Sequence, residues 1–264
     1  MAPAMRCAQH GAAANLLSSD PGLGGAALLA CCGVAPAATG PAWQYSGEYG
    51  PEQWARMRAE WTLCGSGQRQ SPVDITSAQR QSGAMLGFQY KPEPLRIVND
   101  GHTVRVRYRN GSRLLLGREA LTLQQFHFHT PGGDRLNGED FPVAVHLLHK
   151  GASGQLVSLV LLFRLGEPNT ALSELLPRMP TRGLPEQTLA ASLFDPSRLL
   201  PRSTAHYRYD GSLTAPPFTE GVVWLVMKQP LTLSAAQLAQ LKALFPPNAR
   251  PVRPLHGRVV SEGG

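Results

Sequence analysis

Beyond residue 43 the chain is a succession of short runs with β-strand character, separated by glycine, proline and asparagine. Its 27 Gly and 23 Pro have no periodic spacing, which favours a turn-rich β or α+β domain over a helical bundle. The clearest strands are expected at Leu95 to Val98, Thr103 to Tyr108, Arg113 to Leu116, Leu121 to His129, Val143 to His149, Leu156 to Phe163 and Val222 to Lys228. Helices are expected at Thr170 to Leu176 and at Ser234 to Leu244, the second with Ser234 as its N-cap. Because no linker-like stretch interrupts residues 43 to 260, we expect one domain, spanning residues 41 to 264.

The first 40 residues differ from the rest, since small residues dominate them and Arg6 and Asp20 carry their only acidic or basic charges. This stretch is too weakly apolar for a transmembrane helix, and it predicts a signal peptide with a cleavage site at Ala35-Pro36-Ala37. Leu28-Leu29-Ala30-Cys31 also resembles a lipoprotein processing site, so a lipid anchor on Cys31 stays open beside free secretion. Either alternative predicts an exported protein, periplasmic or extracellular.

The chain is basic, with a formal net charge of +7 from 25 Lys+Arg against 18 Asp+Glu. The densest group of cationic side chains consists of Arg105, Arg107, Arg109 and Arg113. They alternate with apolar residues, as on one face of a strand, which is either a solvated face or the basic rim of an anion-handling cleft. No basic patch with interleaved aromatic residues accompanies them, so nucleic-acid binding is not predicted.

Four of the eight histidines fall in two of the expected strands: His127 and His129 in the first, and His146 and His149 in the second. Residues i and i+2 of a strand point to the same face, so His127 and His129 can present two imidazoles to one point. His146 follows a turn-rich connection long enough to return a strand beside the first, and it would add a third imidazole. Three nitrogen ligands on a tetrahedral ion leave the fourth position open, as in catalytic zinc sites. An isolated pair would be only a polar strand face. His149 has the opposite parity to His146 and is expected to be a buried or supporting histidine.

Further motifs stand in a specific order and spacing around these histidines. They are Trp43-Gln44-Tyr45, Gly50-Pro51-Glu52-Gln53-Trp54, Gln70-Ser71-Pro72-Val73-Asp74-Ile75, Asn99-Asp100-Gly101-His102-Thr103-Val104, Gln125 to His129, His146-Leu147-Leu148-His149, Gly211-Ser212-Leu213-Thr214-Ala215-Pro216-Pro217 and Asn248-Ala249-Arg250-Pro251. Together they resemble the α-class carbonic anhydrases, in their short bacterial form, from residue 43 to about residue 260. The resemblance implies a single α+β domain around a large, mostly antiparallel twisted sheet with few short helices.

The resemblance also implies a zinc ion held by His127, His129 and His146. It places Gln125 as the acceptor for the outer N–H of the first ligand, and Thr214 as the partner of the zinc-bound hydroxide. The remaining implied positions are His102 as proton shuttle, Tyr45 as the tyrosine that orders water in the cleft, Ser158 at one wall position, and Leu148, Leu213, Val222 and Trp224 as the apolar wall for carbon dioxide.

Two glutamates of the family pattern are missing. Gly133 stands where a glutamate would accept the proton of the Thr214 hydroxyl, so Thr214 could donate to the hydroxide instead, at a cost on the order of 10- to 1,000-fold in rate. Ala144 stands where a glutamate would support His146, a loss that typically weakens metal binding or activity roughly 10- to 100-fold. The nearby acidic residues that could substitute for them are Asp134, Glu139 and Asp140.

Two further positions depart from the family pattern. Ala215 replaces a frequent second threonine, and Phe218 replaces the cysteine that would pair with Cys64 in many bacterial relatives. The disulfide is therefore expected to be absent, leaving Cys64 free, buried or intermolecular.

Taken together, these features predict a zinc-dependent enzyme that reversibly hydrates carbon dioxide to bicarbonate and a proton, as a monomer or homodimer. A reduced rate is expected from the missing glutamates. The alternative is a zinc-retaining, nearly inactive binding module with the same fold. Retention of His102, Thr214 and all three ligands favours the enzyme, because binding alone would not require them.

Overall fold

A computed structural model describes residues 42–80, 85–109 and 111–264. The predicted leader, with its cleavage site at Ala37 and its possible lipid site at Cys31, lies outside the described residues. None of the helices in the described ranges combines the length and hydropathy needed to span a lipid bilayer.

The described residues contain fifteen strands, several of them only two or three residues long. They are β1 (Asp74–Ile75), β2 (Gln79–Arg80), β3 (Leu86–Gln89), β4 (Glu93–Asn99), β5 (Val104–Arg107), β6 (Arg113–Leu116), β7 (Glu119–His129), β8 (Arg135–Leu136), β9 (Val143–Lys150), β10 (Leu156–Leu165), β11 (Gln187–Phe194), β12 (His206–Ser212), β13 (Glu220–Met227), β14 (Leu231–Leu233) and β15 (Ser261–Gly263).

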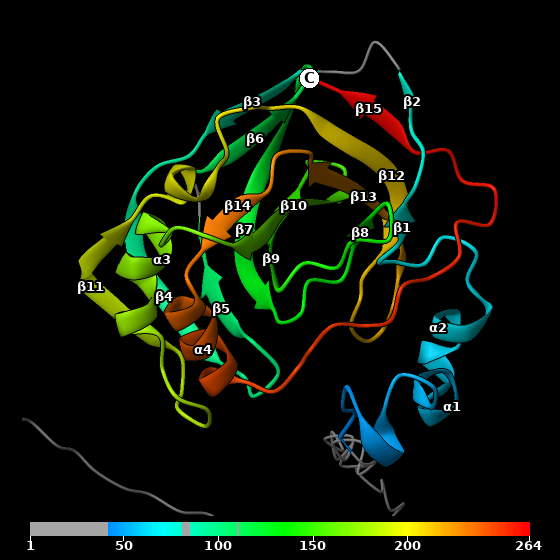
Figure 1. Cartoon of the computed structure of the whole chain (residues 1–264), viewed down its shortest axis with the longest axis horizontal. Coiled ribbons are helices and arrows are strands. Elements are labelled where there is room, and N and C mark those ends of the chain that lie inside the picture. Colours follow the sequence, from blue (N-terminus) through cyan, green and yellow to red (C-terminus); the bar gives the residue numbers. More distant parts are fainter. Residues whose placement is uncertain (1–41, 81–84, 110) are drawn as a thin grey trace, which may run out of the picture. The chain divides into compact units, whose positions relative to one another are not determined.

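Thirteen of these strands form one sheet, with the order β11-β4-β5-β7-β9-β10-β13-β12-β15-β2 along its main path (Figure 1). β6 pairs with β3 and β7, and β14 pairs with β10. Neighbouring strands are antiparallel except for β10 with β13, β10 with β14 and β15 with β2. β1 and β8 pair as a separate two-stranded sheet. The architecture is the predicted one, a large and mostly antiparallel sheet with few short helices.

The helices of the described chain are short. They are the α-helices α1 (Trp54–Met57), α2 (Leu63–Ser66), α3 (Thr170–Leu175) and α4 (Ala235–Leu244), and the 3-10 helices η1 (Gly47–Tyr49), η2 (Ala59–Trp61), η3 (Leu176–Arg178) and η4 (Pro196–Leu199). The two predicted helices are confirmed as α3 and α4. Ser234 caps α4, since its hydroxyl accepts from the backbone N–H of Gln237 while the Gln237 side chain accepts from the backbone N–H of Ser234.

All seven predicted strands are present, with ends that differ from the expected ones by at most two residues. In β7 the alternation places Phe126 and Phe128 in the main apolar core, where both side chains are fully buried. The intervening His127 therefore faces the other side of the sheet. β7 and β9 pair near the middle of the strand order, which puts this histidine face far from either edge strand (Figure 1).

The segment before the sheet is held to the carboxy-terminal segment by a buried arginine. Arg250 donates to the side-chain oxygen of Gln70, to the backbone oxygens of Ser71 and Cys64, and to the sulfur of Cys64. Cys64 is a free, buried thiol that belongs to the same apolar cluster as Phe218. Of the alternatives left open for Cys64, the described residues show the free and buried one, with Phe218 in the position of the family's partner cysteine.

Candidate metal centre

The three histidines singled out by their spacing converge in the structure. His127 of β7 lies directly opposite His146 of β9 in the antiparallel register, and His129 lies two residues along the same face of β7. One ligand nitrogen from each ring lies within 4.8 Å of those of the other two. In the described part of the chain this is the one such cluster of three His, Cys, Asp or Glu side chains.

The outer hydrogen bonds of two histidines fix which nitrogen carries a lone pair. Nδ1 of His127 donates to the side-chain oxygen of Gln125 over 3.0 Å, and Nδ1 of His129 donates to the backbone oxygen of Asn248 over 2.9 Å. Since a neutral imidazole has one N–H, the Nε2 atom of each ring is left as an acceptor. The contact expected for Gln125 is therefore present, whereas Asn248 is a partner that the sequence did not reveal.

His146 lacks such an outer partner. Its Nε2 atom is buried and has no hydrogen-bond partner among the described residues, and the same is true of Nε2 of His129. Buried polar atoms are rarely left without a partner, so Nε2 of His129 is a candidate for binding something other than protein, whereas Nε2 of His146 is the outer nitrogen whose supporting acceptor is missing. Three uncharged nitrogen donors at one point suit a divalent ion of zinc's type, so the residues present fit the ion that the sequence predicts.

Burial keeps these imidazoles neutral. It lowers the pKa of His127 and of His146 well below the usual range, and neighbouring histidines add to both effects. Burial also lowers the pKa of His129, to about 4, although the bond to Asn248 acts in the opposite direction. Protons therefore do not compete with a metal for these nitrogens near neutral pH.

A pocket of about 140 Å³ lies against the histidines. Most residues predicted for the site line it, namely Gln125, His127, His146, Leu148, Ser158, Leu213, Thr214, Val222 and Trp224. Arg105, Ser212, Ala215 and Pro216 complete the lining. The pocket thus combines two metal-binding candidates with an apolar wall.

His102 and Tyr45, the predicted proton shuttle and cleft tyrosine, do not line this pocket but lie together beside the amino-terminal aromatic residues. The His102 ring stacks on the Trp43 ring, with centroids 4.0 Å apart and planes 8° apart, and lies edge-on to Tyr45 at 6.1 Å. Burial lowers the pKa of His102, whereas Asp100 raises it less strongly. Burial raises the pKa of the Tyr45 hydroxyl well above its usual value, so this group is neutral.

None of the acidic residues considered as substitutes for the missing glutamates bonds to Thr214 or His146 within the described ranges. Glu139 forms an ion pair with Arg164 and Asp140 one with Arg135, both at the surface. Asp134 is fully buried, and its Oδ1 accepts from the backbone N–H of Val73 and from the hydroxyl of Tyr209. Gly133 and Ala144 are thus uncompensated by a direct hydrogen bond to either residue.

His149 is buried on the opposite face of β9, where its Nε2 atom lies 2.8 Å from the hydroxyl of Tyr90. The expectation of a buried histidine is confirmed, although its Nδ1 atom has no hydrogen-bond partner among the described residues.

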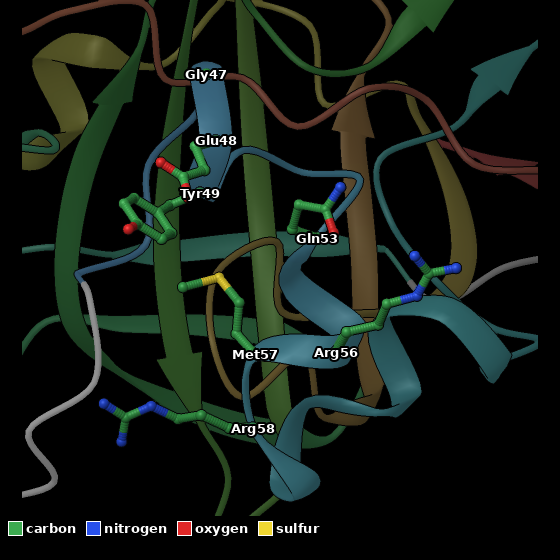
Figure 2. A pocket seen from close by; sticks show the side chains of 7 residues that line it. All are labelled: Gly47, Glu48, Tyr49, Gln53, Arg56, Met57 and Arg58. Atoms are coloured by element: carbon green, nitrogen blue, oxygen red, sulfur yellow. The ribbon is translucent and has the colours of Figure 1, made fainter.

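A second pocket, of about 400 Å³, lies on the amino-terminal segment and shares no lining residue with the first. Figure 2 shows the residues that line it, which are 47 to 49, 53 and 56 to 58. Glu48 is the only acidic residue that lines this second pocket, and no histidine or cysteine lines it. It therefore offers no metal site comparable to the histidine cluster.

Two residues of the site were missed or left undecided by the sequence. Asn248 lies in a motif that marks the family resemblance, but its bond to His129 uses a backbone oxygen, which no side-chain pattern reveals. Arg105 was assigned to a strand face, and the alternation of β5 left open whether that face meets solvent or a cleft. The structure places Arg105 in the pocket lining.

Comparison with known proteins agrees with this geometry. Residues 49–263 match the family model described as eukaryotic-type carbonic anhydrase. A carbonic anhydrase of Pectobacterium carotovorum is 36% identical over 236 residues, which cover 89% of this chain and 96% of that protein.

Solved structures share the fold. The α-carbonic anhydrase of Thermovibrio ammonificans, in complex with the inhibitor sulfanilamide, aligns with a TM-score of 0.80 at 36% identity, covering 84% of this chain and 99% of that chain. Dioscorin complexed with ascorbate aligns with a TM-score of 0.77 at 31% identity, covering 84% of this chain and 98% of that chain.

Proposed function

Because this chain belongs to the α-class carbonic anhydrase family, whose general activity is the hydration of carbon dioxide, we propose that it is a zinc enzyme interconverting carbon dioxide and bicarbonate. The observation that carries the proposal is the convergence of His127, His129 and His146 within 4.8 Å. Their neutral nitrogens would hold the ion without cancelling its charge. When bound, zinc supplies Lewis acidity, which in carbonic anhydrases lowers the pKa of water to about 7.

The pocket wall suits the uncharged substrate. Leu148, Leu213, Val222 and Trp224 line it with apolar surface, next to two of the three histidines. Carbon dioxide loses little on leaving water for such a wall, whereas water molecules are held there weakly. The wall would therefore place carbon dioxide beside the nucleophile.

Thr214 would orient the attacking group. Its hydroxyl would be less firmly oriented than that of a threonine which donates a hydrogen bond to a carboxylate. Its side chain lines the pocket, and no residue of the described chain accepts a hydrogen bond from its hydroxyl. With glycine at position 133, the hydroxyl is free to donate toward the nucleophile and occupy a lone pair that should attack. We therefore propose an active enzyme with a reduced rate.

His102 would pass the released proton to solvent. An imidazole with a pKa near neutrality both accepts and releases a proton readily. The His102 side chain is half-buried, so it has contact with solvent as well as with Trp43. Its lowered pKa keeps it in the proton-accepting form at neutral pH.

A nearly inactive, metal-retaining binding module remains the second candidate. The observation that favours it is Nε2 of His146, buried without a partner where Ala144 replaces a glutamate. Dioscorin, crystallised with ascorbate, has the same fold, so relatives with other ligands exist.

Metal analysis combined with stopped-flow carbon dioxide hydration tests the proposal. Zinc at one equivalent, together with hydration that is lost along with the metal in His127→Ala, would support the enzyme. His149→Ala is the matched control, because this histidine lies on β9 but bonds to Tyr90 on the other face, so the variant should retain zinc. A zinc-loaded protein with no hydration above buffer would favour the binding module, and a protein that takes up no zinc would overturn both.

A further inference from the structure

Arg105 faces the metal centre from the neighbouring strand. In the register of β5 and β7 it lies directly opposite His127, and such pairs of an antiparallel sheet have Cβ atoms roughly 4.5 to 5.5 Å apart. Val104 and Val106, on either side of it, are fully buried in the core. Its side chain is therefore on the histidine face of the sheet, and it lines the same pocket as His127 and Gln125.

The Arg105 guanidinium forms an ion pair with one carboxylate, that of Asp100, which uses only some of its N–H donors. Nη2 of Arg105 lies 3.0 Å from Oδ2 of Asp100, while Oδ1 of Asp100 accepts from the backbone N–H groups of His102 and Thr103. A guanidinium carries five N–H donors, and among the described residues no other acidic side chain pairs with Arg105. About a third of the Arg105 side chain is exposed, so donors remain available to a ligand in the pocket.

Two neighbouring arginines, Arg96 and Arg107, have their charges compensated away from the pocket. Arg107 is next on the same face of β5, and it shares Glu186 with Arg96 at N–O distances of 3.1 and 2.6 Å. Neither Arg96 nor Arg107 lines the histidine pocket. No aspartate or glutamate lines it either, so Arg105 gives the pocket a positive side chain with no negative one.

The geometry points to Arg105 as a binding residue for the anionic partner of the reaction, bicarbonate, and so to a basic cleft wall rather than a merely solvated strand face. This inference rests on the proposed function, because it takes bicarbonate as the product. A cation at the wall contributes nothing specific to uncharged carbon dioxide but forms charge-assisted hydrogen bonds with an oxyanion. Hydrogen bonds to charged groups have strengths that correspond to roughly tenfold or more in affinity.

The test compares three variants by equilibrium titration. Arg105→Gln removes the charge, Arg105→Lys keeps it, and Arg107→Gln removes a neighbouring charge on the same strand that does not reach the pocket. Each protein, substituted with cobalt, is titrated with sodium bicarbonate and separately with imidazole at pH 8.5, and visible absorption reports the dissociation constants. We expect Arg105→Gln to weaken bicarbonate binding on the order of tenfold. Arg105→Lys should retain most of the affinity, and Arg107→Gln should match the wild type.

Imidazole separates a charge effect from damage to the pocket, because at this pH it is a neutral metal ligand. Its dissociation constant should be the same in the wild type and in Arg105→Gln. An unchanged bicarbonate constant in Arg105→Gln, or an equal loss for both ligands, would overturn the inference. Metal content and carbon dioxide hydration of the wild type, measured on the same preparations, decide the proposed function separately: their failure removes the enzyme, while an Arg105 result alone leaves it standing.

Discussion

The hydroxyl of Tyr209 donates a hydrogen bond of 2.8 Å to Oδ1 of Asp134, and both side chains are buried. The Tyr209 ring in turn stacks on that of Trp224, a residue of the pocket wall, with centroids 5.6 Å apart. The titratable carboxyl of Asp134 is thus connected through Tyr209 to the wall of the histidine pocket. Its second oxygen, Oδ2, has no partner among the described residues.

Asp134→Asn should remove a pH dependence of folding. Burial raises the pKa of Asp134 from 3.8 to about 6, so the folded chain keeps this proton to a higher pH than the unfolded chain. The wild type should therefore lose stability as pH rises from about 4 to about 6, by about 3 kcal/mol in total. Asparagine does not titrate, and its oxygen can still accept from Tyr209. Urea unfolding of both proteins between pH 4 and 7 should show the variant gaining relative stability across that window, and a constant difference would contradict the assignment.

Ala144→Glu should tighten metal binding. Residue 144 lies two positions before His146 on the same face of β9, where the Nε2 atom of His146 is buried without a partner. A carboxylate there would accept the imidazole N–H, and supporting bonds of this kind typically change metal affinity roughly 10- to 100-fold. Chelator competition measures the zinc dissociation constant. Ala144→Met, of similar length without an acceptor, is the control, and equal constants for the two variants would refute the prediction.

Gly133→Glu should speed carbon dioxide hydration, on the order of 10- to 1,000-fold, by restoring an acceptor for the Thr214 hydroxyl. The larger side chain is crowded, because a Cβ at this position would lie 3.0 Å from Cγ of Pro72, which must shift slightly. Gly133→Ala carries the same steric cost without the carboxylate, so the ratio of the two hydration rates isolates the orienting effect. Equal rates would mean that another group already orients Thr214.

Trp43→Ala should raise the pKa of His102. Burial is the main cause of its lowered value, and the stacked Trp43 ring, 4.0 Å away, covers one face of the imidazole. With that ring removed, water reaches the imidazole and the charged form is favoured. A proton NMR titration of His102, assigned with His102→Gln, measures the shift. A pKa that stays unchanged or falls would show that the Trp43 ring is not the source of the lowered value.

The strands around the site could be predicted because each alternates between a buried and a polar face or is continuously apolar. β11 could not, since much of this edge strand is exposed and its Ala190, Ala191 and Ser192 carry no apolar pattern. The two-residue strands β1 and β8 depend on pairing between segments about sixty residues apart. A local sequence pattern does not show which distant segments pair.

The same limit applies to the site. The three histidines could be found because strand parity and an antiparallel return bring them together. The role of Asn248 depends on where the backbone of a distant segment passes, and the role of Arg105 depends on which side of β5 meets the pocket. The resemblance to a family identified the missing glutamates, but only the structure showed that Asp134 is bonded to Tyr209 rather than to Thr214 or His146.

Asn248 bonds both to His129, a proposed metal ligand, and to His102, the proposed proton acceptor, which lie on different segments of the chain. Its backbone oxygen holds His129, while its side-chain amide donates to the backbone oxygen of His102 and its side-chain oxygen accepts from the backbone N–H of Thr130. The residue proposed as a metal ligand and the residue proposed as proton acceptor are therefore both held by one asparagine of the carboxy-terminal segment. Any shift of the carboxy-terminal segment at this residue would disturb both the proposed metal ligand His129 and the proposed proton acceptor His102.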